Sequence, residues 1–154
     1  MAPFVEMRGL SLRRGDTQIL LPIDLQDPES WEKALPAARA QAGATGTIHL
    51  LGIVLDIGSS MVATYLPKGF EKQALEAMKD ALDNFAEQQM PGEKVVTHVG
   101  HGHVAETILR SADRIGADLI VMASHQPDEL RSILISSHAN AVVRHAPISV
   151  LVVR

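Results

Sequence analysis

The sequence contains no cysteine, and aromatic residues make up only 3% of its 154 residues. The absence of cysteine excludes disulfide bonds, thiolate catalysis and cysteine-based metal sites. The scarcity of aromatic residues excludes a platform on which nucleic-acid bases could stack. A formal net charge of −4 also argues against a basic face that neutralises phosphates along a nucleic acid. We therefore expect no nucleic-acid partner.

Long hydrophobic runs are also missing. The apolar run Ile19 to Leu25 is interrupted by Pro22 and Asp24 and is too short to cross a bilayer. No apolar signal segment follows the Arg13-Arg14 pair. The sequence predicts a cytoplasmic protein without a membrane span.

The length is that of one domain. Residues 1–16 show no clear period, so we expect a loose N-terminal arm followed by a single domain over residues 17–154.

Five short apolar runs are rich in branched residues and predict strands. They are Thr17–Ile23, Thr47–Leu55, Lys94–Val99, Leu119–Ala123 and Ile148–Val153.

Helical patterns separate these runs. The first is expected to start with Asp27 as N-cap and Pro28 at the first helical position, to bend at Pro36 and to stop at Gly43. The second runs from Gly69 to Gln89, and its apolar stripe is Phe70, Ala74, Leu75, Met78, Leu82 and Phe85. A third begins near Val104 and closes at Gly116, and a fourth lies near His138 to His145.

This alternation predicts an α/β fold, a five-stranded parallel sheet covered on both faces as a doubly wound, Rossmann-like sandwich. Ligands of such sheets bind beyond the carboxyl ends of the strands, where the strand order reverses. The predicted carboxyl ends lie at Asp24, Leu55-Asp56, Val99-Gly100 and Ser124.

Several strings occur in a characteristic order: ILLPID, GATGTIHLLGIV, ADLIVMASH and VVRHAPISVLVV. Together they resemble the universal stress protein family from about Gln18 to Arg154. The stretch LDIGSSMVATYLPKGFEKQAL is similar to the short bacterial branch of that family. The resemblance implies the five-stranded fold, a dimer, and a site that in many members binds ATP or AMP.

The family's nucleotide motif is Gly, two residues, Gly, nine residues, Gly, then Ser or Thr. At the same spacing this chain has Ala123, Gln126, Ser136 and Ser137, so every glycine is replaced and only the closing hydroxyl fits. Glycine allows positive φ and lets backbone N–H groups approach a phosphate. Ser136 is the most costly replacement if its φ must be positive, at roughly 1–3 kcal/mol.

Asp24 matches the family's adenine-contacting aspartate, and a carboxylate there can accept a hydrogen bond from the exocyclic amine. It can equally be a turn residue before the helix start at Asp27. Val54 and Met122 match apolar positions that flank the base, with simple core packing as the alternative. The candidate nucleotide-binding residues are Pro22, Ile23, Asp24, Val54, Met122, Ala123, Ser124, His125, Gln126, Ser136, Ser137, His138 and Ala139.

Two other patterns are weak. Gly100 to Ala105 fits G-x-G-x-x-A after a strand, but the acidic residue expected at the end of the next strand is replaced by Ser124, so a turn is favoured over a dinucleotide site. His98, His101 and His103 lack a nearby carboxylate or cysteine to complete a metal site, and we expect solvated loop histidines.

Two functions follow as hypotheses. The first is a regulatory universal stress protein that binds ATP or AMP, and the second is a member without nucleotide that acts through protein partners. The lost glycines favour the second, and the retained spacing with Asp24 favours the first. We do not expect an enzyme: a slow ATPase would need a general base, and Asp24 would lie at the adenine end.

The last strand, Ile148 to Val153, is apolar on both faces and is expected at a sheet edge. An uncovered apolar edge strand promotes aggregation. We therefore expect a homodimer in which this strand pairs with its copy about a two-fold axis, as the resemblance also implies.

Overall fold

In the computed structural model, the described residues are 17–56, 65–124 and 137–154. The expected N-terminal arm, residues 1–16, lies outside this part of the chain. The strands are β1 (Gln18–Pro22), β2 (Thr47–Val54), β3 (Val95–His101), β4 (Leu119–Ala123) and β5 (Ser149–Val153). The helices are η1 (Pro28–Ser30), α1 (Ala34–Ala42), α3 (Phe70–Gln89), α4 (Val104–Ile115) and α5 (Ser137–His145).

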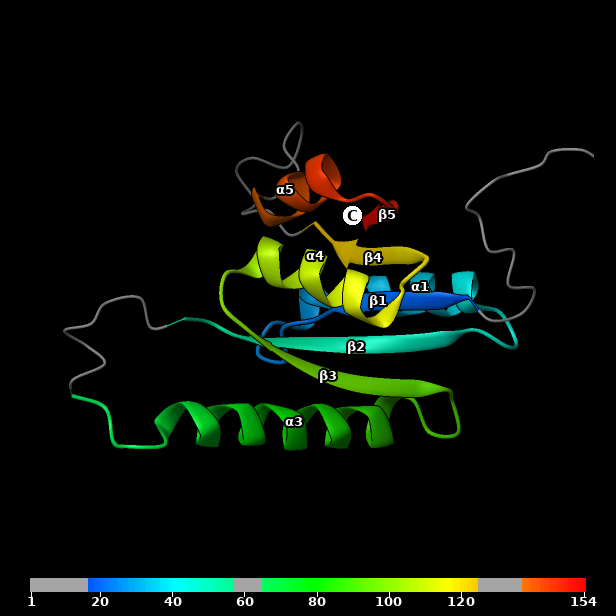
Figure 1. Ribbon diagram of the computed structural model, residues 1–154. Helices are drawn as coiled ribbons and strands as arrows, with labels where there is room; N and C mark the ends of the chain where they lie inside the picture. Colours follow the sequence, from blue (N-terminus) through cyan, green and yellow to red (C-terminus); the bar gives the residue numbers. More distant parts are fainter. Residues whose placement is uncertain (1–16, 57–64, 125–136) are drawn as a thin grey trace, which may run out of the picture.

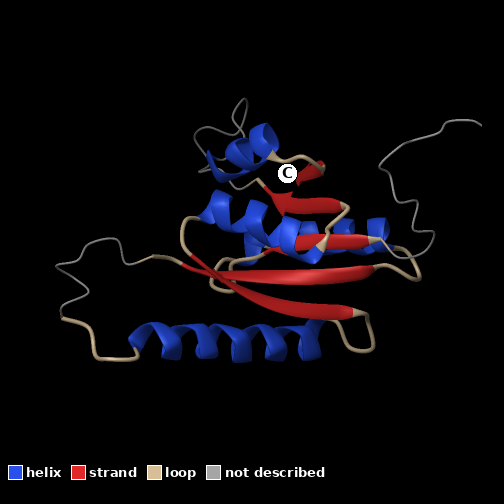
Figure 2. Ribbon diagram, in the orientation of Figure 1, coloured by secondary structure: helices blue, strands red, loops and turns tan. Residues whose placement is uncertain are grey.

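All strand pairs are parallel, and the strand order is β3-β2-β1-β4-β5 (Figures 1 and 2). The chain therefore builds the sheet outward from β1 through β2 to β3, and then continues on the other side of β1 with β4 and β5. The predicted five-stranded α/β sandwich is confirmed, and so is the placement of β5 at a sheet edge.

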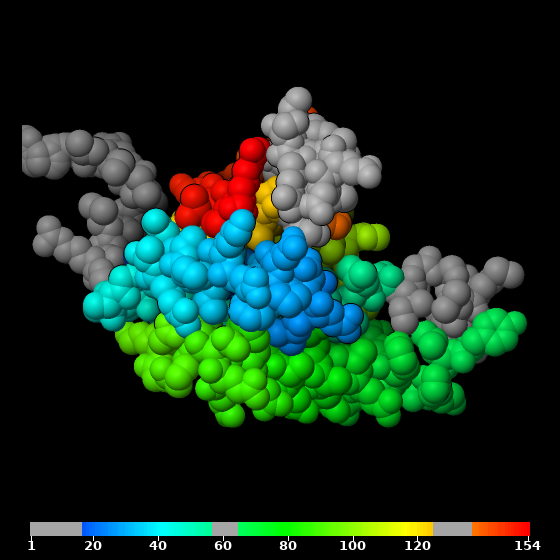
Figure 3. Space-filling view, turned by 180° about the vertical axis from the view of Figure 1, so that it is seen from behind, coloured from blue at the N-terminus to red at the C-terminus, as the bar shows by residue number. Residues whose placement is uncertain are grey.

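Side chains that alternate along each strand separate two apolar cores, one on each face of the sheet. Ile19, Leu21 and Val121 pack with α1 and with Leu82 of α3. Leu20, Ile120 and Met122 pack on the opposite face with α4 and α5. Figure 3, seen from behind, shows η1 and α1 in light blue above α3 in green.

The first helix differs from the prediction. Asp27 does cap a helix start, because its Oδ1 accepts the N–H of Glu29 at 3.2 Å, but that start is only the 3₁₀ turn η1. The α-helix begins at Ala34. Pro36 explains the break: a helix continuing from Pro28 would need an N–H at residue 36, whereas in the first turn of α1 no such N–H is required. Pro36 therefore marks a helix start instead of a kink.

The other helix boundaries agree with the sequence pattern to within a residue or two. Gly43 follows α1 and Gly116 follows α4, both with positive φ. Strand β3 is longer than predicted, since it continues past Val99 to His101. Among the described residues, no helix combines the length and apolar character needed to span a membrane.

Candidate functional site

The strand order reverses between β1 and β4, and the two strands pair only over their first residues. The paired positions are Ile19 with Leu119 and Leu20 with Ile120. Beyond them β1 stays paired with β2 as far as Pro22, and β4 stays paired with β5 as far as Ala123. The carboxyl halves of β1 and β4 are thus joined to their outer neighbours and no longer to each other, which is the arrangement that accommodates ligands in open α/β sheets.

Asp24 follows β1 at this point, and its carboxylate is exposed. Its Oδ1 accepts the backbone N–H of Gln26 at 2.9 Å. The backbone of Asp24 is held by Ser30, whose Oγ accepts the Asp24 N–H at 2.8 Å and donates to the Asp24 carbonyl at 2.9 Å. Asp24 is therefore a turn residue, and its Oδ2 has no hydrogen-bond partner in the described part of the chain.

The neighbours of Asp24 on β1 have backbone roles. The N–H of Ile23 donates to the carbonyl of Leu51 at 3.0 Å, and its side chain is buried in the core against α1. Pro22 ends the strand and is partly exposed. Ile23 is consequently a core residue, so that only its backbone lies at the carboxyl edge.

The candidates on β4 lie directly opposite. Met122 is 6% exposed and packs in the core with α4 and α5, which is the packing role left open for it. Ala123 is partly buried. The backbone N–H of Ser124 donates to the carbonyl of Val153 at 2.8 Å and so continues the ladder between β4 and β5.

The remaining loop candidates are only partly described. His125, Gln126 and Ser136 lie outside the described residues. Ser137 and His138 are exposed in the first turn of α5, while Ala139 is fully buried. The two exposed residues stand at a helix N-terminus, where the helix dipole favours an anion.

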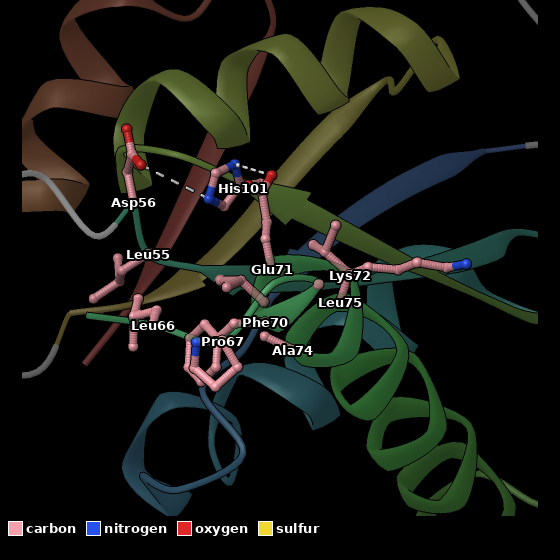
Figure 4. A pocket seen from close by; sticks show the side chains of 12 residues that line it. Leu55, Asp56, Leu66, Pro67, Phe70, Glu71, Lys72, Ala74, Leu75 and His101 are labelled. Atoms are coloured by element: carbon pink, nitrogen blue, oxygen red, sulfur yellow. Dashed lines mark ion pairs between the residues drawn. The ribbon is translucent and has the colours of Figure 1, made fainter. Parts of the chain in front are cut away.

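Val54 leads to a cavity that the sequence pattern does not predict. It ends β2, accepts the N–H of Gly102 at 3.1 Å, and lines a cavity of about 560 Å³ between the end of β2 and the start of α3. The wall includes Leu55, Leu66, Phe70 and Leu75 (Figure 4). Phe70 and Leu75 belong to the apolar stripe expected to be core, yet Phe70 is 38% exposed because the first turn of α3 extends past the sheet.

His101 also lines this cavity and lies close to two carboxylates. Its Nδ1 lies 3.4 Å from Oε1 of Glu71, and its Nε2 lies 3.8 Å from Oδ1 of Asp56 (Figure 4). The three side chains come from β3, α3 and the end of β2. The imidazole of His101 thus lies between two carboxylates at the rim of the cavity.

The expectation of solvated loop histidines is wrong for His98. It lies within β3, is partly buried, and stacks on His49 with its Nε2 2.8 Å from the Nδ1 of His49. Burial lowers the pKa of both histidines. The neighbouring His98 lowers the pKa of His49 further, and Lys79 and Arg114 lower the pKa of His98 further. His103 is exposed before α4, as expected. Within the described ranges, no three His, Asp or Glu side chains form a group that could hold a metal ion.

The glycines of the G-x-G-x-x-A pattern have packing roles. A Cβ on Gly100 would lie 2.2 Å from Cγ2 of Thr107, so α4 approaches β3 too closely for any side chain there. Gly102 has φ +128°, which favours glycine in the turn before α4. The pattern is thus explained by the strand-to-helix connection, which agrees with the favoured interpretation.

The fold and its switch point define a doubly wound α/β protein with a candidate ligand site at the carboxyl ends of β1 and β4. The chain belongs to the universal stress protein family, whose defining sequence pattern matches residues 17–154.

Known proteins agree with this assignment. Universal stress protein G of Shigella flexneri is 30% identical over 142 residues, which cover 88% of this chain and 97% of that protein. Universal stress protein G of Salmonella typhimurium is 29% identical over 139 residues with the same coverage. Among solved structures, the hypothetical protein MJ0577 has a TM-score of 0.71 at 27% identity, covering 89% of this chain and 94% of its own. A universal stress protein solved in complex with cAMP has a TM-score of 0.60 at 15% identity, covering 90% and 97% of the two chains, and shows the shared fold alone.

Proposed function

We propose that this protein is a dimeric regulatory module that binds an adenine nucleotide, ATP or AMP, where β1 and β4 cease to pair. The observation that carries the proposal is the end of the β1–β4 ladder at Leu20 and Ile120, with Asp24 beyond one strand and Ser124 beyond the other. A nucleotide there would lie across the sheet edge between two fixed strand ends.

Asp24 supplies the element of recognition. Because its Oδ1 accepts the N–H of Gln26, the carboxylate is held in one orientation. Its Oδ2 is then left to accept a hydrogen bond from a ligand. A carboxylate only accepts hydrogen bonds, so it suits the exocyclic amine at C6 of adenine and opposes the carbonyl oxygen that guanine carries at C6. The first turn of α5, with Ser137 and His138 exposed, offers N–H groups to phosphate at the other end.

A second candidate function is favoured by the loop sequence. The positions of the three motif glycines hold Ala123, Gln126 and Ser136, and each side chain restricts the approach of phosphate to the backbone. In this case the chain would act through protein partners, with no nucleotide. Catalysis belongs to neither candidate, because a regulator requires only binding.

Calorimetry with ATP and AMP on the purified protein separates the two candidates. For the first, Asp24→Asn should lower the preference for ATP over GTP by about 1–3 kcal/mol, because the amide nitrogen replaces an acceptor by a donor while the amide oxygen still accepts the Gln26 N–H. Asp27→Asn is the matched control, since it changes the same charge at a cap outside the site. The absence of heat and of a thermal shift at millimolar ATP and AMP would reject the first candidate and leave the second.

A gain-of-function variant tests the loop directly. Ser136→Gly combined with Gln126→Gly should increase nucleotide affinity if backbone approach limits binding. Unchanged affinity in this double variant would show that the missing glycines do not set the affinity.

A further inference from the structure

A second cavity lies along β3, the edge strand on the side of the sheet away from β4 and β5. Its volume is about 620 Å³, and its lining residues come from α3, β3 and α4, which are labelled in Figure 1. Strand β3 ends the sheet on this side, so β2 lies between this groove and the site at the carboxyl ends of β1 and β4. We call it the β3-edge groove.

The groove collects positive charge in a chain whose net charge is −4. Lys79 contributes from α3, while Arg110 and Arg114 contribute from α4. Glu76 is the one acidic residue among those that line the groove, and its Oε1 lies 3.9 Å from Nζ of Lys72 on its own helix. The lining therefore has three basic side chains against a single acidic one.

The two arginines are one helical turn apart, and like charges at that spacing repel each other. Among the described residues neither forms an ion pair with a carboxylate, although Nη2 of Arg110 donates to the carbonyl of His101 at 3.1 Å. Lys79, in contrast, is paired with Asp83 at 2.8 Å. The side of the groove formed by α4 thus carries uncompensated charge, which a bound anion would neutralise.

His98 lies on β3 among the residues that line the groove. Lys79 from α3 and Arg114 from α4 both lower its pKa, after the larger effect of burial. Its Nε2 lies 2.8 Å from Nδ1 of His49, and Nε2 of His49 donates to Oε1 of Gln18 at 2.6 Å. These hydrogen bonds fix the imidazole of His98 at the groove.

We propose that the β3-edge groove binds a small molecule through a di- or triphosphate group. Guanidinium groups bind phosphate oxygens in pairs, and two arginines in succession suit a chain of linked phosphates better than a single one. The groove has the size of small-molecule sites, which span roughly 300–1,000 Å³. Lys79, on α3, is a third basic side chain of the lining, and its charge is already paired with Asp83.

The test uses the full chain with inorganic pyrophosphate and tripolyphosphate as probes, at low ionic strength and without nucleotide. Calorimetry should show binding, and Arg110→Gln with Arg114→Gln should weaken it roughly tenfold or more, because charge-assisted contacts to phosphate are lost. Arg144→Gln, an exposed arginine of α5, is the matched charge control and should change the affinity little. Ser137→Ala with His138→Gln, in the first turn of α5 where the proposed nucleotide site would hold phosphate, should also leave pyrophosphate binding intact, so failure of the nucleotide site would not affect this result.

Melting temperature tests whether the double variant acts through binding. Without probe it should melt at the same temperature as the unaltered protein or higher, because repulsion between the arginines is relieved. Arg110→Lys with Arg114→Lys keeps both charges and loses the paired geometry, so it should fold normally and bind the probes more weakly. Full affinity in that lysine variant would contradict the arginine contacts.

Two other results would overturn the proposal. They are no binding of either probe at millimolar concentration, and an equal loss of affinity in Arg144→Gln. The second would mean that the probes respond to overall charge instead of to this groove.

Discussion

Gly100 lies where α4 comes closest to β3. The nearest atom to a Cβ at this position would be Cγ2 of Thr107, at 2.2 Å, and the hydroxyl of Thr107 is buried without a partner among the described residues. Thr107 therefore gains little from its hydroxyl, while its methyl group fills the space that glycine leaves. The close contact between β3 and Thr107 therefore makes glycine necessary at position 100.

Gly100→Ala should lower the free energy of unfolding by about 1–3 kcal/mol, as an overpacked core does. Gly100→Ala with Thr107→Ala should recover most of that loss, because the second change removes the clashing methyl group together with the unpaired hydroxyl. Urea unfolding of both variants measures the difference. If the double variant is as unstable as Gly100→Ala alone, contact with Thr107 is not the reason for glycine.

Sequence and structure agree best at residues whose role is local. Asp27, Gly43 and Gly116 were predicted as helix boundaries because caps and positive φ depend on adjacent backbone alone. His98 lies within the predicted strand Lys94–Val99, but it was misassigned because its partner, His49, is 49 positions away along the chain. No local pattern signals that contact.

At the scale of elements, three neighbouring strands share one polar row. Gln18 of β1, His49 of β2 and His98 of β3 are linked by hydrogen bonds on the face of the sheet that carries the α4 core. This row interrupts an otherwise apolar face next to Leu20 and Leu51. Because burial and nearby positive charge oppose protonation, the row is stable with neutral imidazoles.

This row should make stability depend on pH. The pKa of each histidine is lowered from 6.5 in the folded chain, chiefly by burial. Below pH 6.5 the unfolded chain therefore binds protons that the folded chain resists. The stability from the neutral pair is fully present above pH 6.5 and is lost as the pH falls toward the lowered values.

Urea unfolding between about pH 7.5 and pH 5.5 measures the effect. His49→Leu with His98→Leu should flatten the pH dependence, because both titrating groups are removed from the sheet. His103→Gln with His145→Gln removes two exposed histidines and is the matched control, which should keep the slope of the unaltered protein. Equal slopes in all three proteins would contradict the role of the buried pair.

Neither cavity could be predicted from the sequence, because each one, like the histidine row, is formed by residues far apart along the chain. The wall near Val54 combines the end of β2, the first turn of α3 and His101, and the β3-edge groove combines faces of α3 and α4. Amphipathic patterns show that a helix has an apolar stripe, but not how far that helix extends past the sheet. Phe70 was therefore expected in the core and lines an open cavity instead.

At the scale of the whole molecule, the doubly wound parallel sheet was predictable because parallel strands with helical crossovers have few allowed arrangements. The strand order leaves β3 and β5 as the two edges. Strand β3 lies beside α3, whereas β5 follows α5 directly and its residues Val150 to Val153 are all partly exposed. An apolar edge of this kind requires a cover, and a second copy of β5 is the simplest one.

The backbone of β5 allows a test of this dimer that spares the fold. The carbonyl of Val153 accepts from Ser124 and so points toward β4. Successive residues of a strand direct their N–H and C=O groups to opposite sides. The backbone N–H of Val152 therefore points outward, and that of Leu151 points toward β4. Val152→Pro should therefore remove one outward donor and yield a folded monomer, since proline is tolerated on the free side of an edge strand.

Leu151→Pro is the contrasting variant, because it removes a donor to β4 and should lower the melting temperature instead of only separating the two copies. Light scattering at micromolar concentration gives the mass of each protein, and circular dichroism reports whether it is folded. A monomer mass for the unaltered protein would refute the β5 dimer. A dimer mass that persists in folded Val152→Pro would place the interface elsewhere, since an antiparallel pair of β5 strands cannot form its full ladder without that N–H.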